Sequence, residues 1–255
     1  MQKPKFIDLF CGAGGLGIGL AEAGFENVLS TDSDYDAIQT MNSHSNHPVL
    51  QSDIIDLIQN LETGQVVLPE IDLVAGGPPC QGFCAINPRR SENDPRNSLV
   101  DSFLHVVSII QPKAVLMENV TGLLSLAKGI AIKKIEKRLK CLGYNVCYKV
   151  LQAAHYGAPQ SRWRLFVVAL KKGDFQFPVP THAAQIVPNF VRGRELTFEY
   201  RDNDLFSSVE RHPTVWDAIS DLPPLENGEI FQKAPYTKVI NSSFQEHARL
   251  NCCEL

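Results

Sequence analysis

A cysteine in a rigid setting is the first candidate for chemistry in this chain. Residues 76–84 read GGPPCQGFC, so Cys80 follows two glycines and two prolines. Proline fixes the backbone φ angle and donates no hydrogen bond, so this stretch cannot continue a central strand and must form a stiff loop. Such a loop would hold the sulfur of Cys80 at a set position. From these residues alone, Cys80 is either a nucleophile or a structural thiol.

Two other uses of Cys80 fit the sequence poorly. A structural zinc site needs a second pair of Cys or His ligands, and the Cys80–Cys84 spacing has none nearby. The chain has seven cysteines, an odd number, and no Cys-x-x-Cys pair. The first ten residues lack the features of a signal peptide, and no apolar run reaches the ~18 residues of a membrane span. We therefore expect a cytoplasmic protein with free thiols, no metal and no membrane association.

A thiol nucleophile needs cations and a proton donor close to it. An ordinary cysteine is mostly protonated at neutral pH, and neighbouring cations favour its thiolate. Arg162 and Arg164, in QSRWRLF, are two residues apart on an expected strand, so both would face one side. The simpler alternative is an arginine pair that solvates an edge strand. Glu118 lies at the end of the apolar stretch AVLMEN, where partial desolvation would suit its carboxyl group to proton donation. The alternative is that Glu118 caps a helix.

A glycine-rich turn and two aspartates could bind a nucleoside. FCGAGGLG, residues 10–17, joins an expected strand to a helix, and its glycines allow a ligand to approach the backbone. It lacks the pattern of a phosphate-binding P-loop, and a purely structural turn remains open. Asp32 ends the next strand, where a carboxylate binds ribose hydroxyls in nucleoside-binding sheets, or else it caps a helix over 33–41. Asp53, in QSDII, is equally ambiguous.

Short apolar stretches alternate with amphipathic helical patterns along most of the chain. This alternation predicts a mostly parallel α/β sheet with helices on both faces. The expected strands are 5–10, 27–32, 71–77 and 114–119, and the expected helices are 14–23, 97–111 and 130–142. Residues 144–152 and 165–170 have no helix between them and are expected to be antiparallel neighbours at the sheet edge. Residues 178–213 look like a surface excursion, and 214–225 predict a short helix capped by Thr214 and Asp217.

The charge of the chain argues against a broad nucleic-acid surface. The 255 residues are 44% hydrophobic and 20% charged, as in an ordinary globular protein, and the formal net charge is −4. A protein that binds nucleic acid over its whole surface is usually basic. Any contact with nucleic acid must therefore come from local clusters, or from something outside this chain.

Five motifs taken together resemble one enzyme family. FIDLFCGAGGLGIGL, GGPPCQGF, DPRNSL, ENVTGLL and YGAPQSRWR occur in this order, over about residues 5 to 170. The set is similar to that of the cytosine-5 DNA methyltransferases of the bacterial restriction-modification type. The resemblance implies a Rossmann-like, S-adenosylmethionine-dependent methyltransferase fold with an antiparallel edge strand. It also implies double-stranded DNA as the partner and a base flipped out of the helix.

The resemblance also implies roles for individual residues. Cys80 would attack C6 of cytosine, Glu118 would contact N3, and Arg162 and Arg164 would steady the base and the thiolate. The residues expected to line the S-adenosylmethionine pocket are Phe10, Gly12, Gly14, Asp32 (for the ribose), Asp53 and Ile54 (for the adenine), Pro79 and Leu99. Cys84 stands where the family often has serine after QGF, a departure that looks tolerable.

The resemblance weakens towards the end of the printed sequence. The family continues with a target-recognition region and further motifs that close the cofactor pocket, and we find neither here. We therefore expect residues 1–177 to form the catalytic domain and 178–255 an extension towards a target-recognition region. The first hypothesis is the large part of a split enzyme that needs a second polypeptide. The alternatives are a truncated remnant, a non-catalytic binding module, and a tRNA cytosine-5 methyltransferase.

Overall fold

The structure, a computed structural model, describes residues 2–79, 98–125, 129–183, 210–229 and 239–249. They fall into two compact units. The first contains residues 1–150 and 164–177, and the second contains 151–163 and 178–255. Residues 151–163, which the sequence analysis placed in the catalytic domain, belong to the second unit. The functional assignment of the two parts stays a prediction.

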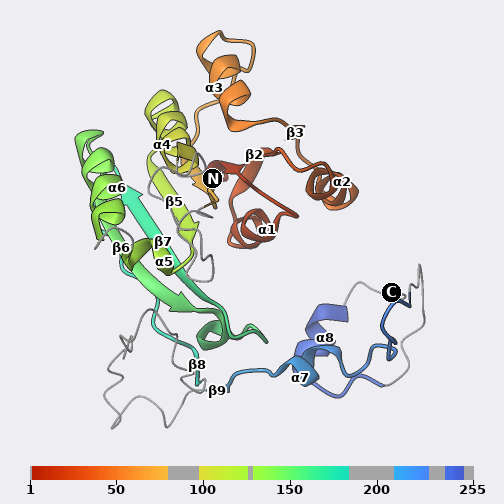
Figure 1. The fold of residues 1–255 in the computed structure, drawn as a ribbon. Helices are drawn as coiled ribbons and strands as arrows, with labels where there is room; N and C mark the ends of the chain where they lie inside the picture. The colour runs from red at the N-terminus through yellow and green to blue at the C-terminus, as the bar shows by residue number, and fades with distance from the viewer. Residues whose placement is uncertain (1, 80–97, 126–128, 184–209, 230–238, 250–255) are drawn as a thin grey trace, which may run out of the picture. The chain divides into compact units, whose positions relative to one another are not determined.

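A seven-stranded sheet forms the centre of the first unit, in the order β3-β2-β1-β4-β5-β7-β6 (Figure 1). The strands are β1 (Lys5–Leu9), β2 (Glu26–Asp32), β3 (Val49–Gln51), β4 (Leu73–Gly76), β5 (Ala114–Asn119), β6 (Asn145–Gln152) and β7 (Trp163–Leu170). The pairs β1–β2, β1–β4, β2–β3 and β4–β5 are parallel, and β7 pairs with β5 in the antiparallel sense. The mostly parallel sheet with an antiparallel strand confirms the predicted fold class.

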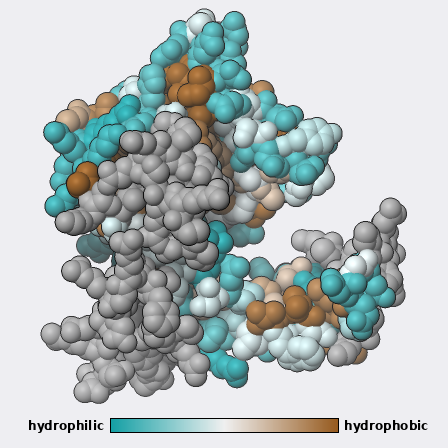
Figure 2. Space-filling model, in the orientation of Figure 1, coloured by the Kyte–Doolittle hydropathy of each residue, from teal (hydrophilic) through white to brown (hydrophobic). Residues whose placement is uncertain are grey.

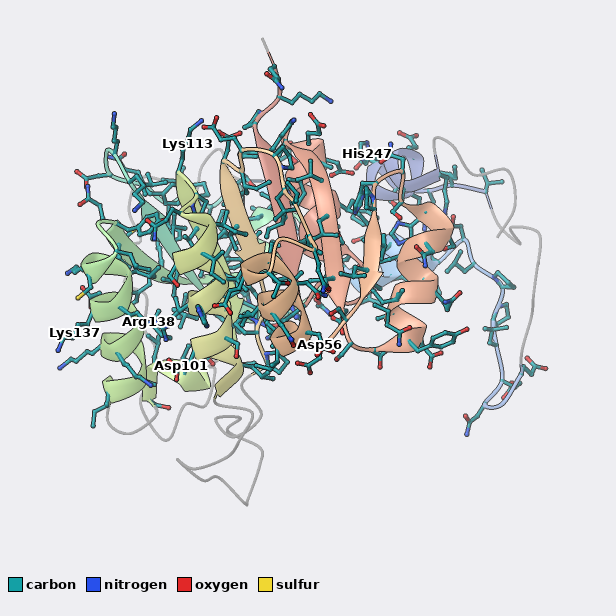
Figure 3. All side chains as sticks on the ribbon, turned by 90° about the horizontal axis from the view of Figure 1, so that it is seen from above. Asp56, Asp101, Lys113, Lys137, Arg138 and His247 are labelled. Atoms are coloured by element: carbon teal, nitrogen blue, oxygen red, sulfur yellow. The ribbon has the colours of Figure 1, made fainter. Side chains whose placement is uncertain are left out.

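Helices connect the parallel strands and cover the sheet. They are α1 (Gly15–Glu22), α2 (Tyr35–His44), α3 (Ile54–Glu62), α4 (Ser98–Ile110), the short α5 (Gly122–Ser125) and α6 (Ile130–Cys141). Helix α4 contacts both α3 and α6. Two ion pairs join α4 to α6, because Asp101 accepts hydrogen bonds from Lys134 and Arg138. Asp101 and Arg138 are labelled in Figure 3.

The sheet is buried on both faces, as its apolar strands predict. Phe6, Leu73 and Ala75 form one cluster with side chains of α1, including Leu16 and Leu20. Side chains alternate along a strand, so the neighbouring residues Ile7 and Val74 point to the opposite face, and both are also fully buried. Two helical layers therefore sandwich the central strands, which is the usual environment of a parallel sheet.

The position of β7 is the main feature of the sheet that the sequence did not predict. Residues 144–152 and 165–170 are neighbours, as expected, but β7 is inserted between β5 and β6. In the register, Glu118 lies opposite Phe166 and Asn119 opposite Leu165. The insertion brings the start of β7, with Arg164, beside the end of β5. This juxtaposition is what assembles the candidate site.

The second unit contains the 3-10 turn η4 (Ala153–Tyr156), a two-stranded ladder and two short helices. The ladder pairs β8 (His182–Ala183) with β9 (Glu210–Arg211), and the helices are α7 (Val215–Ile219) and α8 (Ser243–Arg249). Thr214 and Asp217 cap α7 reciprocally, which confirms the predicted cap pair. Three apolar side chains of α7 are exposed to solvent, namely Val215, Trp216 and Ile219, and an apolar patch is visible on this unit in Figure 2.

Candidate active site

The site lies where three neighbouring parallel strands end at one level. Leu9 of β1 lies opposite Gly76 of β4, and Gly76 lies opposite Met117 of β5. Leu9 and Met117 are followed by the predicted site residues Phe10 and Glu118. Gly76 is followed by Gly77, which begins the loop that leads to Cys80. Ligands of open parallel sheets bind beyond the carboxyl ends of the strands, so this edge is the expected place for chemistry.

The end of β5 holds the backbone that leads into the Pro-Pro-Cys loop. The side-chain amide of Asn119 donates a buried hydrogen bond of 2.9 Å to the carbonyl oxygen of Pro78. A side chain at Gly76 would overlap the carbonyl oxygen of Leu9, so only glycine fits there. Pro78 is buried and Pro79 is partly buried. The chain is thus fixed up to the residue before Cys80, which itself lies outside the described residues.

Glu118 and Arg164 form an ion pair beside this segment. The Nε atom of Arg164 lies 2.8 Å from Oε1 of Glu118, and both side chains are about one quarter exposed. The other carboxyl oxygen of Glu118 faces Gly77, since a Cβ built on that glycine would lie 3.4 Å from Oε2. The structure therefore brings together the predicted acid, one predicted arginine and the start of the cysteine loop.

Arg162 is in a different environment from Arg164. Strand β7 begins at Trp163, so Arg162 precedes the strand and belongs to the second unit. Its side chain is exposed, and its carbonyl oxygen accepts a 2.9 Å hydrogen bond from the backbone N–H of Ala153. The expectation that the two arginines share one side of a strand is therefore not met. The predicted role of Arg162 stays a prediction.

Asp32 organises the glycine-rich turn. Its Oδ2 accepts a 2.9 Å hydrogen bond from the backbone N–H of Gly12, and its Oδ1 accepts one of 3.0 Å from Asp34. The alternative that Asp32 caps the following helix is wrong, because Asp34 is the N-cap of α2 and accepts from the N–H of Ala37. Sequence spacing missed this because either aspartate could precede the helix.

The turn itself has an unusual backbone. Phe10 and Gly12 have φ angles of 56° and 52°, and Gly14 has 97°. A positive φ is uncommon for a bulky residue such as Phe10 and is strained, and such strain concentrates at functional sites. Gly14 must lack a side chain, because a Cβ there would overlap the sulfur of Met41.

The remaining predicted pocket residues have ordinary structural roles as well. Asp53 caps α3 by accepting a 2.8 Å hydrogen bond from the N–H of Ile55, so its capping alternative is confirmed. Ile54 is buried, and Leu99 is partly buried on α4. Asp32 pairs in register with Gln51, two residues before Asp53, so both aspartates lie at the same edge of the sheet. The predicted nucleoside contacts of Asp32 and Asp53 stay predictions.

Asp8 is a residue of this region that sequence reasoning missed. It lies fully buried in β1, and neither carboxyl oxygen makes a hydrogen bond to a described residue. Burial raises the pKa of Asp8 to about 7; the nearby backbone of Gly17 opposes this rise, and the carboxylate of Asp32 adds to it. Burial likewise raises the pKa of Cys11 to about 12. The signal was an acidic residue inside the apolar strand FIDLF.

The raised pKa of Asp8 makes stability depend on pH. Because the folded state holds this proton more tightly than the unfolded chain, whose pKa is near the ordinary 3.8, stability falls as pH rises from there to about 7. We expect Asp8→Asn to remove this loss. Relative to the wild type, the variant should gain about 3 kcal/mol between about pH 5 and about pH 8. Urea denaturation measures this gain. The exposed control Asp56→Asn should show none, and a pH-independent difference for Asp8→Asn would contradict the assignment.

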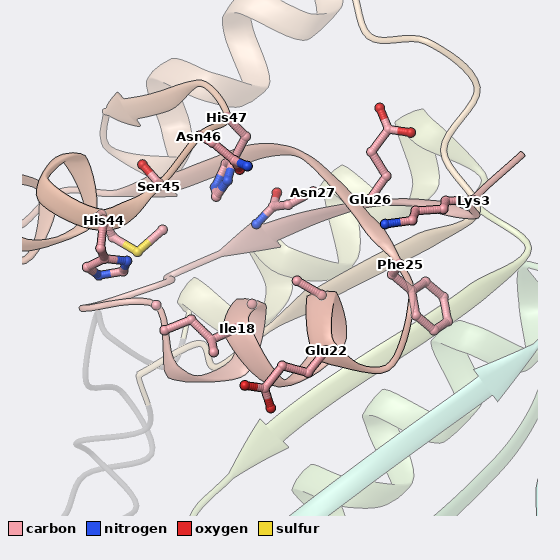
Figure 4. A pocket seen from close by; sticks show the side chains of 14 residues that line it. Lys3, Ile18, Glu22, Phe25, Glu26, Asn27, His44, Ser45, Asn46 and His47 are labelled. Atoms are coloured by element: carbon pink, nitrogen blue, oxygen red, sulfur yellow. The ribbon is translucent and has the colours of Figure 1, made fainter. Parts of the chain in front are cut away.

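A cavity of about 440 Å³ lies beside the glycine turn, along α1 and α2 (Figure 4). Its lining includes Gly14, Ile18, Asn27, His44 and His47. His47 contacts the hydroxyl of Ser30 at 2.9 Å, and burial lowers its pKa. Its lining does not include Asp32 or Asp53. Of the predicted cofactor residues only Gly14 lines it, so we do not identify this cavity with the predicted cofactor pocket.

Two features are absent from the described part of the chain. No helix in it combines the length and the apolar composition needed to cross a bilayer. Within the same residues, no three His, Cys, Asp or Glu side chains are grouped as a metal site would require.

Known proteins resemble the chain in sequence and in fold. It is 40% identical to type II methyltransferase M.AquIA of Picosynechococcus, over 88% of this chain and 90% of that protein. It is 35% identical to type II methyltransferase M.AgeI of Thalassovita gelatinovora, over 98% of this chain but only 59% of that protein. A solved structure described as a DNA modification methyltransferase from an E. coli prophage superposes with a TM-score of 0.56 at 31% identity, covering 66% of this chain and 47% of that one.

A family model supports the same assignment over almost the whole chain. The model of the C-5 cytosine-specific DNA methylases matches residues 4–247. This span contains all the motifs quoted above and most of both units of the structure. The chain therefore belongs to the C-5 cytosine-specific DNA methylase family.

Proposed function

We propose that this protein transfers a methyl group from S-adenosylmethionine to C5 of a cytosine flipped out of double-stranded DNA, in the cytoplasm of a bacterium. The observation that carries the proposal is the Glu118–Arg164 ion pair beside Gly77, with Asn119 holding the loop one residue further on. A carboxyl group, a guanidinium group and the first residues of the stiff cysteine loop lie close together at one edge of the sheet. This is the set that addition to a pyrimidine requires.

The residue types account for the steps of the reaction. C5 of cytosine is a poor nucleophile, so the Cys80 thiolate first adds to C6, and the ring double bond shifts to make C5 an enamine carbon. Glu118 stabilises the charge that develops at N3 through a hydrogen bond or a proton. Bound S-adenosylmethionine would supply the methyl group as an electrophile for C5, leaving S-adenosylhomocysteine. Loss of the C5 proton to a base then restores the double bond and expels Cys80.

The glycine turn and Asp32 fit the proposed cofactor. Each oxygen of the Asp32 carboxylate accepts one backbone N–H, from Gly12 and from Asp34. An ionised carboxylate has about four acceptor sites, so it can still accept hydrogen bonds from two ribose hydroxyls. The turn it holds lies at the edge of the sheet where nucleosides bind. We propose the same pocket for Asp53, Ile54, Pro79 and Leu99.

Asp32→Ala should therefore weaken cofactor binding. A hydrogen bond to a charged group contributes about 1.5–3 kcal/mol, so we expect the Kd for S-adenosylhomocysteine to rise about ten- to a hundredfold. Isothermal titration calorimetry measures this. The matched control is Asp34→Ser, which keeps a good N-cap on α2 and should bind as the wild type does. Equal affinity of Asp32→Ala and the wild type would remove Asp32 from the pocket.

We further propose that target recognition needs a second polypeptide. Supporting this, the chain spans only 59% of M.AgeI, so a large part of that relative has no counterpart in the printed sequence. The net charge of −4 also fits a DNA-reading surface located elsewhere.

Labelled methyl transfer tests both proposals. The chain is incubated with labelled S-adenosylmethionine and mixed-sequence DNA, with and without a candidate small subunit encoded nearby, and the methylated base is mapped. We expect 5-methylcytosine only when the partner is present. Full activity of the chain alone would contradict the split reading, and label at another base, or on tRNA only, would contradict the reaction itself.

A further inference from the structure

In the second unit, a short polypeptide segment packs against the turn that precedes Arg162. We call Thr181 and His182 the Thr-His clamp. The backbone N–H of Thr181 donates a 2.9 Å hydrogen bond to the carbonyl oxygen of His155, in η4. The Thr181 hydroxyl lies 2.9 Å from Nδ1 of His182 and 3.5 Å from the same carbonyl oxygen. The clamp is thus fixed to the turn by its backbone, and its hydroxyl orients the imidazole.

The imidazole of His182 covers Gly157, the residue that ends η4. Gly157 has a φ of 86°, and a Cβ built on it would lie 2.9 Å from Cε1 and 3.2 Å from Nε2 of His182. The ring therefore lies directly on the glycine. Nε2 is also 3.7 Å from Oε2 of Glu210, the residue paired with His182 in the ladder. The ring thus fills the space above a turn that admits no side chain.

The covered turn leads to Arg162. Its two ends are joined by the hydrogen bond from the N–H of Ala153 to the carbonyl oxygen of Arg162. A second bond, 3.2 Å long, runs from the N–H of Ala158 back to Ala153. Next to Arg162, the Trp163 ring contacts the His155 ring edge to face, with centroids 6.0 Å apart. Through these hydrogen bonds and this ring contact, a displacement of η4 or Gly157 would also displace the backbone of Arg162.

We propose that His182 is a positioning residue for methyl transfer, which keeps the turn at 153–162 in the geometry that presents Arg162. The proposal rests on the function proposed above, because it takes Arg162 to act on the target base. His182 contributes through its ring contact with Gly157, with Thr181 setting the orientation of the ring. Its proposed action is on the turn and not on the reacting atoms.

The test is a double-mutant cycle in the labelled-transfer assay with any required partner present. We expect His182→Ala to lower kcat about ten- to a hundredfold, the scale on which small misplacements of a catalytic group act, with the KM for S-adenosylmethionine unchanged. In an Arg162→Ala background the same substitution should have no further effect, because residues that act through one another are not additive. His182→Phe, which restores a ring over Gly157, should recover most of the rate.

Two controls keep the outcome interpretable. His247→Ala removes an exposed histidine of α8 in the same unit and should leave kcat unchanged. Thermal unfolding of each variant shows whether it is folded at the assay temperature. Methyl transfer that stays at the wild-type rate in His182→Ala, or losses that multiply in the double variant, would overturn the proposal. Absence of transfer in the wild type with its partner would instead refute the proposed function.

Discussion

Replacing Cys80 by serine is expected to abolish methyl transfer. A serine hydroxyl is hardly ionised at neutral pH, so addition to C6 fails, and loss of a covalent nucleophile lowers kcat by about 10⁴-fold or more. The variant should still bind S-adenosylhomocysteine, because the sulfur is not needed for that. Labelled transfer and the trapping of a covalent complex with DNA that contains 5-fluorocytosine measure the two consequences.

The same loop provides a control for this result. Cys84 lies four residues further on, where the related enzymes often have serine, so Cys84→Ser should keep its activity and its covalent complex. If Cys80→Ser retained either the activity or the complex, the nucleophile would have to be another residue, or the chain would be a binding module.

Glu118→Gln is expected to give the second largest loss. Glutamine keeps the size of the side chain but cannot deliver a proton to N3, and general acid catalysis is worth about 10²–10⁴-fold. It also removes the charge that faces Arg164 across 2.8 Å. We expect kcat to fall by about this factor while cofactor affinity is retained. Steady-state kinetics and calorimetry separate the two quantities.

An exposed glutamate of the same unit serves as the comparison. Glu70 pairs with Lys113 at the surface, and Glu70→Gln should have no effect on kcat. A wild-type rate in Glu118→Gln would show that Glu118 is not the group that acts at N3, and would contradict the proposed chemistry.

The sequence predicted β1, β2, β4 and β5 because each is a short apolar stretch with a clear end, but it did not predict the three-residue parallel strand β3. The same ends located Phe10, Asp32, Gly77 and Glu118 at one edge. What could not be predicted depends on contacts between distant segments. Nothing local to residues 163–170 tells that β7 enters between β5 and β6, yet only this insertion pairs Arg164 with Glu118.

Asp8 and the two aspartates near α2 show the same limit on a smaller scale. The motif containing Asp8 was recognised, but the burial of its carboxyl group, without a hydrogen-bond partner among the described residues, is a property of the packed sheet. Asp32 and Asp34 both precede α2, and only their hydrogen bonds in the structure separate their roles: Asp34 accepts from Ala37, and Asp32 accepts from Gly12. The position of Cys80 relative to Glu118 lies outside the described residues, so the central prediction of the sequence stays a prediction.

The hydrogen bond from Asn119 to Pro78 has a consequence for how the enzyme could move. Asn119 is the residue next to Glu118, so the end of β5 carries the acid and also holds, through this hydrogen bond, the peptide that leads into the cysteine loop. Bending or sliding of this tip would carry both groups together and change their mutual spacing little. A conformational change on DNA binding would then alter the distance from Glu118 and the cysteine loop to the methyl donor. The distance between Glu118 and the start of the loop would stay nearly constant.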